Sequence, residues 1–196
     1  MFSFCIIKER LKEFIFMKLM IASDIHGSAY YCKKITEAFE REKADKLLLL
    51  GDILYHGPRN ALPKDYSPKE VAAMLNAMKN KIICVKGNCD CDVDQMVLEF
   101  PIMAPYCIIA FENRIIFATH GDKFNVDNLP ALNNGDVLLY GHFHVPACEE
   151  KDSYIYMNPG SVSIPKENSK NSYMVTDGDY FAWKDTDSNV YMEKRL

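Results

Sequence analysis

The chain has 196 residues, of which 48% are hydrophobic and 26% charged, and its formal net charge is −4 at pH 7. These values indicate one globular domain with a sizeable core, and the negative charge argues against extended binding to nucleic acid or anionic lipid. No apolar run approaches the roughly 18 residues that a membrane-spanning helix needs. The seven cysteines are an odd number and are scattered along the chain, which is not the pattern of a disulfide framework. We therefore expect reduced thiols and a cytoplasmic location.

We interpret residues 1–17 as an extension ahead of a single domain at 18–196. The extension mixes apolar and charged residues and lacks the uninterrupted apolar core and cleavage site of a signal peptide. An upstream start and a short added helix both fit this composition. Its apolar residues, with those at 100–103, are candidates for a contact between copies in a homo-oligomer.

The first half of the chain alternates between predicted strands and helices. Strands are predicted at 18–23, 46–50 and 81–86, and the four consecutive leucines of the second indicate a strand covered on both faces. Apolar residues at helical spacing predict a helix at 28–43, so the chain opens with a βαβ unit. A loop at 56–66 precedes a second helix at 67–79, which has Ser at the N-cap and Pro at the first helical position.

The second half is mainly β. A hairpin is predicted at 106–111 and 114–119, followed by strands at 137–140, 154–157, 172–176, 180–184 and 190–192. The Asp-Gly pair between the strands at 172–176 and 180–184 is a good hairpin signal. We therefore expect an α/β (mixed α+β) fold, a four-layer sandwich of two mainly mixed β-sheets flanked by helices.

Five short motifs follow predicted strands and hold four of the five histidines. They are Asp24-x-His26, Gly51-Asp52, Gly87-Asn88, His120-Gly121 and Gly141-His142-x-His144. A single Gly-Asp is usually a turn, and a single histidine after a strand is usually a satisfied polar residue. The joint pattern favours a metal site instead. Ligands gather at strand ends in open sheets, and donors two residues apart, as in Asp-x-His and His-x-His, lie on the same side of an extended segment.

Oxygen and imidazole donors without thiolate suit Mn²⁺, Zn²⁺, Fe²⁺, Ni²⁺ or Co²⁺. Seven side chains are too many for one ion with an open position, so we predict two divalent ions that share Asp52, with Mn²⁺ as the first choice. The pair Cys89-x-Cys91 has no second pair and is weak evidence for zinc.

The five motifs, in this order, resemble those of the calcineurin-like metallophosphoesterases: D-x-H, G-D, G-N-[HC]-[DE], H-G and G-H-x-H. The resemblance covers about residues 18–172, and segments 18–27, 56–63, 87–90 and 158–166 are similar to the bacterial YfcE-type phosphodiesterases of that family. It implies a two-sheet sandwich in which one ion is held by Asp24, His26 and His144. The other is held by Asn88, His120 and His142, with Asp52 as the bridge.

Two ions about 3.5–4 Å apart acidify a shared water and clamp the oxygens of an in-line displacement at phosphorus. Asp52 and Asn88 would then be catalytic as well as metal-binding. One position departs from many relatives, because Cys89 stands where they have a histidine, and a thiol is a poorer cation and a weaker hydrogen-bond donor. We hypothesise that His56 reaches the substrate in its place; the alternative is a purely structural role in the loop.

Further contacts are predicted around this centre. Arg59, Asn60 and Cys89 are the predicted substrate-binding residues, with Lys166 as a further candidate. Arg59 and Lys166 could contact the substrate phosphate; the alternative for each is that it is an ordinary charged residue of the surface. Asp90 and Asp122 are candidates to hydrogen-bond the ligands, although a turn or cap role fits them equally.

The predicted function is metal-dependent hydrolysis of a small phosphodiester by a hydroxide that bridges two ions. The alternatives are a phosphomonoesterase of the same fold and a non-catalytic scaffold such as the retromer subunit, which lacks part of the metal set. No ligand position is missing from this sequence, which argues against a scaffold. A nuclease would need a basic groove or an added DNA-binding domain, and the chain shows neither.

Overall fold

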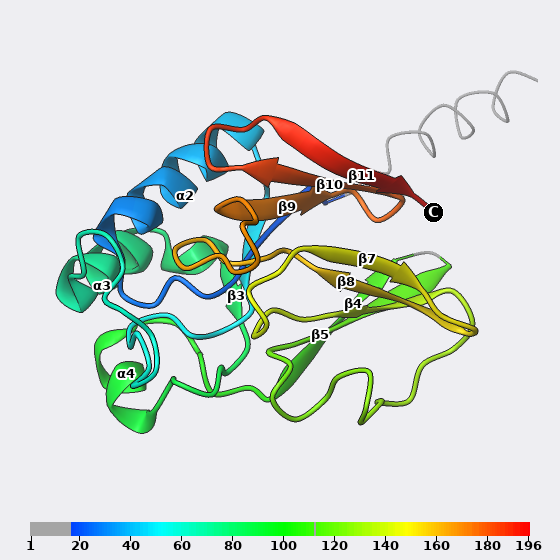
Figure 1. The fold of residues 1–196 in the computed structure, drawn as a ribbon, viewed down its shortest axis with the longest axis horizontal. Helices are drawn as coiled ribbons and strands as arrows, with labels where there is room; N and C mark the ends of the chain where they lie inside the picture. Colours follow the sequence, from blue (N-terminus) through cyan, green and yellow to red (C-terminus); the bar gives the residue numbers. More distant parts are fainter. Residues whose placement is uncertain (1–16, 112) are drawn as a thin grey trace, which may run out of the picture.

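The computed structural model describes residues 17–111 and 113–196, which form two β-sheets packed face to face with helices beside the first (Figure 1). The prediction of a mixed α/β fold with two mixed sheets is confirmed. The predicted extension at 1–17 lies outside the described residues except for its last position. In the part of the chain that the structure describes, no helix is both long and apolar enough to cross a bilayer.

The first sheet has six strands in the order β11-β10-β9-β1-β2-β3. They are β1 (Leu19–Ala22), β2 (Lys46–Leu49), β3 (Ile82–Cys84), β9 (Ser172–Thr176), β10 (Tyr180–Asp185) and β11 (Val190–Arg195). Strands β1, β2 and β3 run parallel, β9 pairs antiparallel with β1, and β10 and β11 are each antiparallel to the strand before them. The carboxyl ends of β1, β2 and β3 therefore lie at the same edge of the sheet.

The second sheet has five strands in the order β4-β5-β6-β8-β7. They are β4 (Tyr106–Phe111), β5 (Arg114–Thr119), β6 (Asp136–Leu139), β7 (Ala147–Glu150) and β8 (Tyr154–Asn158). Strands β5, β6 and β8 are parallel, and the edge strands β4 and β7 are antiparallel to their neighbours. The sequence did not predict β7, because two of its four residues are glutamates and none is fully buried.

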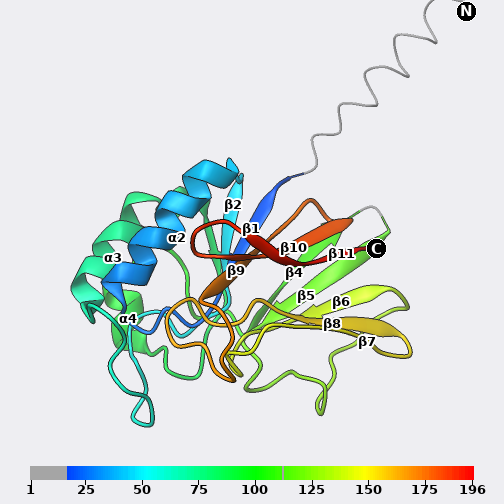
Figure 2. The same cartoon turned by 45° about the horizontal axis from the view of Figure 1, so that its top comes forward.

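The helices are α2 (Ala29–Glu42), α3 (Pro68–Ala77) and the short α4 (Asp92–Val97), with a 3₁₀ turn at Lys79–Lys81. The hydroxyl of Ser28 caps α2 by accepting the N–H of Tyr31 at 3.3 Å. Helices α2 and α3 confirm the two predicted ones, and Figure 2 shows them together beside the first sheet. Helix α4 was not predicted, because its six residues are too few for a helical period and none is buried.

The leucine run of β2 belongs to two cores at once. Leu47 and Leu49 pack with α2 and α3, whereas Leu48 and Leu50 pack between the two sheets. Alternate side chains of a strand point to opposite faces, which explains why this strand has no polar face. The predicted strand with both faces covered is confirmed.

The segment 100–103 belongs to the core beside the helices. Phe100 and Ile102 are only 4% and 0% exposed, and both pack in the cluster that includes α2 and α3. These two side chains are therefore not exposed for the predicted contact between copies, whereas Pro101 is exposed and Met103 half-buried. The contact itself stays a prediction.

The outer face of the second sheet carries aromatic residues and is covered by a loop. Phe117, Tyr140 and Tyr156 lie on this face, and Phe124 and Val126 pack over them from the segment between β5 and β6. In the described part of the chain, helices thus flank the first sheet, and the fourth layer of the predicted sandwich is this loop. The segment is rich in Asn, Asp and Pro, which favour turns over helix.

Candidate metal centre

The predicted ligands follow strands of both sheets. Asp24 comes after β1, Asp52 after β2 and Asn88 after β3, all from the first sheet. His120 follows β5, and His142 and His144 follow β6 in the second sheet. Because the carboxyl ends of these strands meet at one edge of the sandwich, all seven predicted ligands come together there.

One group consists of Asp24, His26 and His144. The Nε2 atoms of the two histidines are 3.3 Å apart, and they lie 3.6 Å and 3.2 Å from Oδ1 of Asp24. All three side chains are buried. Three donor atoms facing one point at these distances are the arrangement that a bound cation requires.

The second group consists of Asn88, His120 and His142. The amide oxygen of Asn88 lies 2.9 Å from Nε2 of His120 and 2.8 Å from Nδ1 of His142. The two histidine nitrogens are 3.2 Å apart. This group therefore offers one neutral oxygen and two imidazole nitrogens.

Asp52 lies between the two groups. Its Oδ2 is 3.6 Å from Nε2 of His26 and 3.5 Å from Nε2 of His120. Its other oxygen accepts the backbone N–H of Cys89 at 2.8 Å, which fixes the rotation of the carboxylate. One oxygen is thus held in reach of both groups, which is the position of a bridging ligand.

Three of the histidines are oriented by backbone carbonyls. Nδ1 of His26, His120 and His144 lies 2.8, 2.7 and 2.7 Å from the carbonyl oxygens of Tyr55, Leu50 and Ile164 respectively. A carbonyl can only accept, so Nδ1 carries the proton and the lone pair of Nε2 points to the centre. This second contact is typical of histidines that bind a metal.

Asp24 gives the clearest sign that these donors fit a cation. Its Oδ2 accepts the hydroxyl of Ser23 at 2.6 Å and the N–H of His142 at 3.1 Å. Its Oδ1 is buried and has no hydrogen-bond partner among the described residues. A buried carboxylate oxygen without a donor is costly, and a bound cation would remove that cost.

The backbone is strained at the same residues. Asp24, His26, Asp52, His142 and His144 all have φ between 49° and 63°. Such left-handed conformations are uncommon outside glycine and cluster at functional sites. Five of the seven predicted ligands thus adopt a conformation that folding alone does not favour.

Two glycines allow the close approach of the loops. A Cβ on Gly87 would lie 2.2 Å from Oδ1 of Asp52, and one on Gly141 would lie 1.9 Å from Oγ of Ser23. Neither position has room for a side chain, which explains the glycines in the Gly-Asn and Gly-His motifs.

Comparison with known proteins identifies the family. The model of the calcineurin-like phosphoesterase superfamily domain matches residues 17–179. The chain belongs to this family. It is 52% identical over 163 residues to Phosphodiesterase YfcE of Escherichia coli, covering 83% of this chain and 89% of that protein. It is also 25% identical over 167 residues to Probable metallophosphoesterase YsnB of Bacillus subtilis, covering 81% and 83%.

Solved structures agree with this assignment. The structure of YfcE from E. coli, described as a phosphoesterase, has a TM-score of 0.88 and 47% identity, covering 91% of this chain and 99% of that one. Vacuolar Protein Sorting 29 from Cryptosporidium parvum has a TM-score of 0.59 at 16% identity, covering 91% and 98%. The second likeness shows the fold alone. The resemblance inferred from the sequence motifs is confirmed.

Within this calcineurin-like centre, the pKa shifts of the ligands run in both directions. Burial alone would raise the pKa of Asp24, but its contacts with His144 and His26 hold that pKa well below the usual value. Burial and the nearby His120 lower the pKa of His142, whereas, against the opposing effect of burial, Asp24 and Asp52 raise the pKa of His26 and of His120. Metals bind an ionised carboxylate and a neutral imidazole, so a cation would compete with protons at His26 and His120.

Residues next to the ligands hold the strained loops in place. Asp90 accepts the N–H groups of Asp52, Ile53 and Gly87 at 2.9, 2.9 and 2.8 Å. The hydroxyls of Ser161 and Ser163, both in segment 158–166, donate to the carbonyl of Asp24 at 3.0 Å each. The prediction that Asp90 contacts the centre agrees with this, although it holds backbone rather than ligand side chains.

Asp122 and Cys91 make no side-chain hydrogen bond to the ligands in the described residues. Asp122 is exposed, and it acts on His120 and His142 only through its charge, which favours their protonated forms. Cys91 is also exposed, and its thiol contacts Oδ2 of Asp94 at 3.3 Å. The pair Cys89-x-Cys91 therefore does not form a zinc site.

A cavity of about 360 Å³ opens over the centre. Besides ligand residues, it is lined by Arg59, Asn60, Cys89, Phe143 and Lys166. The three predicted substrate-binding residues thus face the same space as the ligands. Phe143 was missed, and its only signal in the sequence is its place between the two histidines of Gly-His-x-His.

Asn60 and Cys89 have defined contacts in this cavity. Nδ2 of Asn60 donates to the carbonyl of His56 at 2.8 Å, so Asn60 holds the turn of this loop. Burial and the neighbouring Asp52 raise the pKa of Cys89 to about 12. Cys89 is therefore a thiol at neutral pH, able to donate only weakly.

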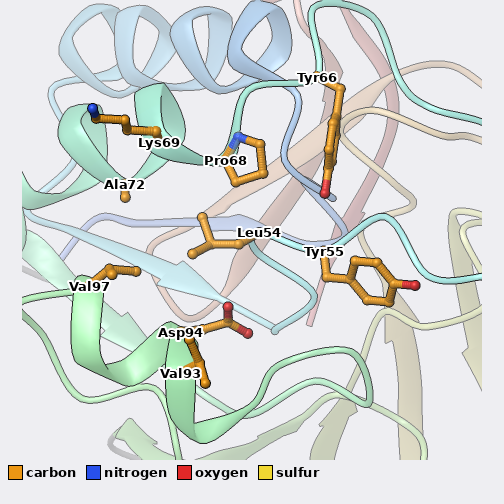
Figure 3. Close-up of a pocket in the computed structure, with 9 residues that line it drawn as sticks. All are labelled: Leu54, Tyr55, Tyr66, Pro68, Lys69, Ala72, Val93, Asp94 and Val97. Atoms are coloured by element: carbon orange, nitrogen blue, oxygen red, sulfur yellow. The ribbon is translucent and has the colours of Figure 1, made fainter.

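His56 does not line this cavity. Its ring packs edge-on against Tyr55 and Tyr66, with ring centroids 4.8 and 5.2 Å away. The two tyrosines border a second, largely apolar cavity of about 380 Å³, which lies between α3 and α4 (Figure 3). Nδ1 of His56 is buried without a hydrogen-bond partner among the described residues. That His56 reaches the substrate stays a prediction, and packing against the two tyrosines is the contact that the structure shows.

Proposed function

We propose that this chain is a metal-dependent phosphodiesterase that hydrolyses a small phosphodiester at a centre of two divalent ions. The observation that carries the proposal is the placement of one Asp52 oxygen 3.6 Å from His26 and 3.5 Å from His120. Asp24, His26 and His144 would hold one ion, and Asn88, His120 and His142 the other. Two bound ions supply Lewis acidity toward water and toward a phosphoryl group.

The residues of the chain set the charge and orientation of this centre. Asp24 and Asp52 are the only carboxylates among the seven ligands, since Asn88 offers a neutral oxygen. Two divalent ions would leave the centre positive, which favours an anionic phosphate ester. Arg59 and Lys166 line the cavity and would contact the phosphate oxygens.

The 52% identity to a protein named phosphodiesterase supports diesters over monoesters. A phosphomonoesterase of the same fold remains the second candidate, since two ions can serve both reactions. A non-catalytic scaffold is disfavoured, because every ligand position here holds a side chain that can coordinate a metal.

We propose Mn²⁺ as the native metal, with Zn²⁺, Fe²⁺, Ni²⁺ and Co²⁺ as alternatives, since all seven donors are nitrogen or oxygen. The six cysteines of the described residues are free, which supports a reducing compartment such as the cytoplasm. The net charge of −4 supports a small phosphoester as the partner rather than extended nucleic acid.

The test compares bis(p-nitrophenyl) phosphate with p-nitrophenyl phosphate, using the purified full chain and each of the five metals in turn. We expect the diester to be hydrolysed with the higher kcat/KM, and a chelator to abolish turnover. Preference for the monoester would favour the second candidate function. No turnover of either ester with any metal would contradict the enzymatic account.

A further inference from the structure

Phe143 forms part of two neighbouring hollows. It lines the cavity over the metal centre, and it also lines a groove of about 510 Å³ on the outer side of the second sheet. Lys166 is the other side chain common to both. The two hollows therefore meet at Phe143 and Lys166, so a molecule bound at the centre can extend into the groove.

The ring of Phe143 is held at this border by its backbone. Both flanking residues, His142 and His144, have positive φ, and the N–H of Phe143 bonds to the carbonyl of Gly141 at 2.6 Å. The tight turn presents the side chain to solvent, and Phe143 is 49% exposed. The phenyl ring is therefore accessible to a molecule bound at the adjoining centre.

A series of aromatic rings leads from the metal centre into the groove. The Phe143 ring lies 5.2 Å from that of His142 and 6.0 Å from that of Tyr140. Tyr140 in turn stacks on Tyr156 at 4.4 Å; both tyrosines are buried and form the floor of the groove, and Val145 also lines it. Flat aromatic and aliphatic side chains favour a planar apolar group.

The groove is basic where it adjoins the cavity over the metal centre and acidic farther from it. Lys166 is its only basic lining residue and lies on the side shared with the metal centre. Glu149 and Glu167 line the groove but not the cavity over the centre. A phosphate is therefore favoured next to the centre, and a second anionic group is disfavoured farther along the groove.

We propose that this groove is a subsite for one ester group of the substrate, and that it selects an uncharged aromatic ring, such as an aryl group or a nucleobase, stacked on Phe143. The inference rests on the proposed function, since it takes the phosphate to bind at the metal centre. The substrate class is then a phosphodiester that carries at least one aromatic ester group without a further phosphate.

The test measures binding, so its outcome does not depend on turnover. Dissociation constants of methylphosphonate and phenylphosphonate are measured by calorimetry with the Mn²⁺-loaded full chain, because each probe has a single organic group. We expect phenylphosphonate to bind about tenfold more tightly, as stacking on an aromatic side chain is worth that much or more. Phe143→Ala is expected to reduce this ratio to about twofold, and Phe143→Trp to preserve it.

Met96→Ala is the matched control, since Met96 is 83% exposed on α4 and lines neither hollow. It should leave the tenfold ratio unchanged. A ratio near one in the unmodified protein, a ratio unaffected by Phe143→Ala, or no binding of either probe would overturn the subsite. Diester hydrolysis together with a ratio near one would overturn the subsite alone, whereas a tenfold ratio without hydrolysis would count against the proposed function alone.

The charge requirement is tested with 4-carboxyphenylphosphonate. We expect it to bind at least threefold more weakly than phenylphosphonate, and the difference to shrink in a Glu149→Gln/Glu167→Gln variant. Equal or tighter binding of the carboxylated probe would overturn the requirement for an uncharged ring.

Discussion

Two clusters of buried charged side chains lie at opposite ends of strand β1, and they differ in how their charges are matched. At the amino end, Glu42 accepts hydrogen bonds from Lys18 at 3.0 Å, Lys184 at 2.6 Å and the Tyr173 hydroxyl at 2.9 Å. At the carboxyl end, Asp24 keeps one buried oxygen without a hydrogen-bond partner in the described part of the chain. The first cluster is complete within the protein, whereas the second needs a ligand.

The backbone makes the same distinction. Glu42 ends the regular helix α2, but five of the candidate metal ligands have positive φ. Each such residue costs on the order of 1–3 kcal/mol. In this molecule, a buried charge that has hydrogen-bond partners and a regular backbone therefore serves the structure. A buried carboxylate oxygen that has no partner and lies on a strained backbone serves the function.

The largest expected effect is that of Asp52→Asn. The amide keeps an oxygen for the Cys89 N–H but removes the charge shared by the two groups, so kcat/KM should fall at least about 1,000-fold, equivalent to about 4 kcal/mol. The melting temperature in chelator should stay the same or rise. Steady-state kinetics and thermal denaturation check this, and a loss of activity below tenfold would contradict a bridging role.

Asp90→Asn should affect both activity and stability, because the buried Asp90 carboxylate has hydrogen-bond partners and at the same time holds the backbone of the metal centre. An amide nitrogen cannot accept, so at least one of the three backbone N–H groups bound by Asp90 would lose its acceptor. We expect a loss of about 1–3 kcal/mol in the free energy of unfolding and about 10- to 100-fold in kcat/KM. Denaturant titration and kinetics on the same preparation check both, and an unchanged kcat/KM would show that Asp90 does not position the Asp52 loop.

Glu42→Gln should lower stability while leaving kcat/KM within about twofold. Breaking a buried ion pair costs about 3–5 kcal/mol when one partner is lost, and less here because the Lys18 side chain is 39% exposed. Denaturant titration measures the loss, and kinetics under native conditions provide the control. A large loss of activity would mean that the two clusters are coupled.

The same variant has a pH signature. Burial alone would raise the pKa of Glu42, but Lys184, Lys18 and Tyr173 hold it below the ordinary value of 4.5. A depressed carboxyl pKa contributes stability that is present above the unfolded pKa and is lost as pH falls through the folded pKa. The difference in melting temperature between the unmodified protein and Glu42→Gln should therefore narrow as the pH falls from 7 to 3. A difference that widens would contradict the lowered pKa of Glu42.

His56→Ala should have the smallest effect, a change in kcat/KM below about threefold for activated and unactivated diesters alike. The ring packs with Tyr55 and Tyr66 outside the cavity over the metal centre. A loss above tenfold, restricted to the unactivated diester, would contradict this expectation and support the contact of His56 with the substrate that the sequence suggested.

The positions of the first-sheet ligands were predictable because each depends on a local rule. The leucine run of β2 has no polar face, so it had to lie between two layers, and Asp52 had to emerge at the end of that strand. Strands β1, β2 and β3 are parallel, so a residue after each of them reaches the same edge. The histidines after β5 and β6 reach that edge only through the packing of the two sheets, and the joint pattern of the motifs grouped them with the others.

The remaining features depend on contacts between distant segments. Strand β7 contains two glutamates and is held by pairing with β8 rather than by its own apolar pattern. The place of His56 is set by stacking with Tyr66, ten residues away in the sequence. The aromatic groove beside Phe143 combines residues of β7, β8 and the loops around them, and no sequence motif predicts it.

The most direct test of the central claim is anomalous diffraction from crystals of the full chain grown with Mn²⁺. The account predicts two peaks about 3.5–4 Å apart, one on each side of the Asp52 carboxylate, with His26 and His144 at one and His120 and His142 at the other. A single peak, or peaks that do not contact Asp52, would contradict it.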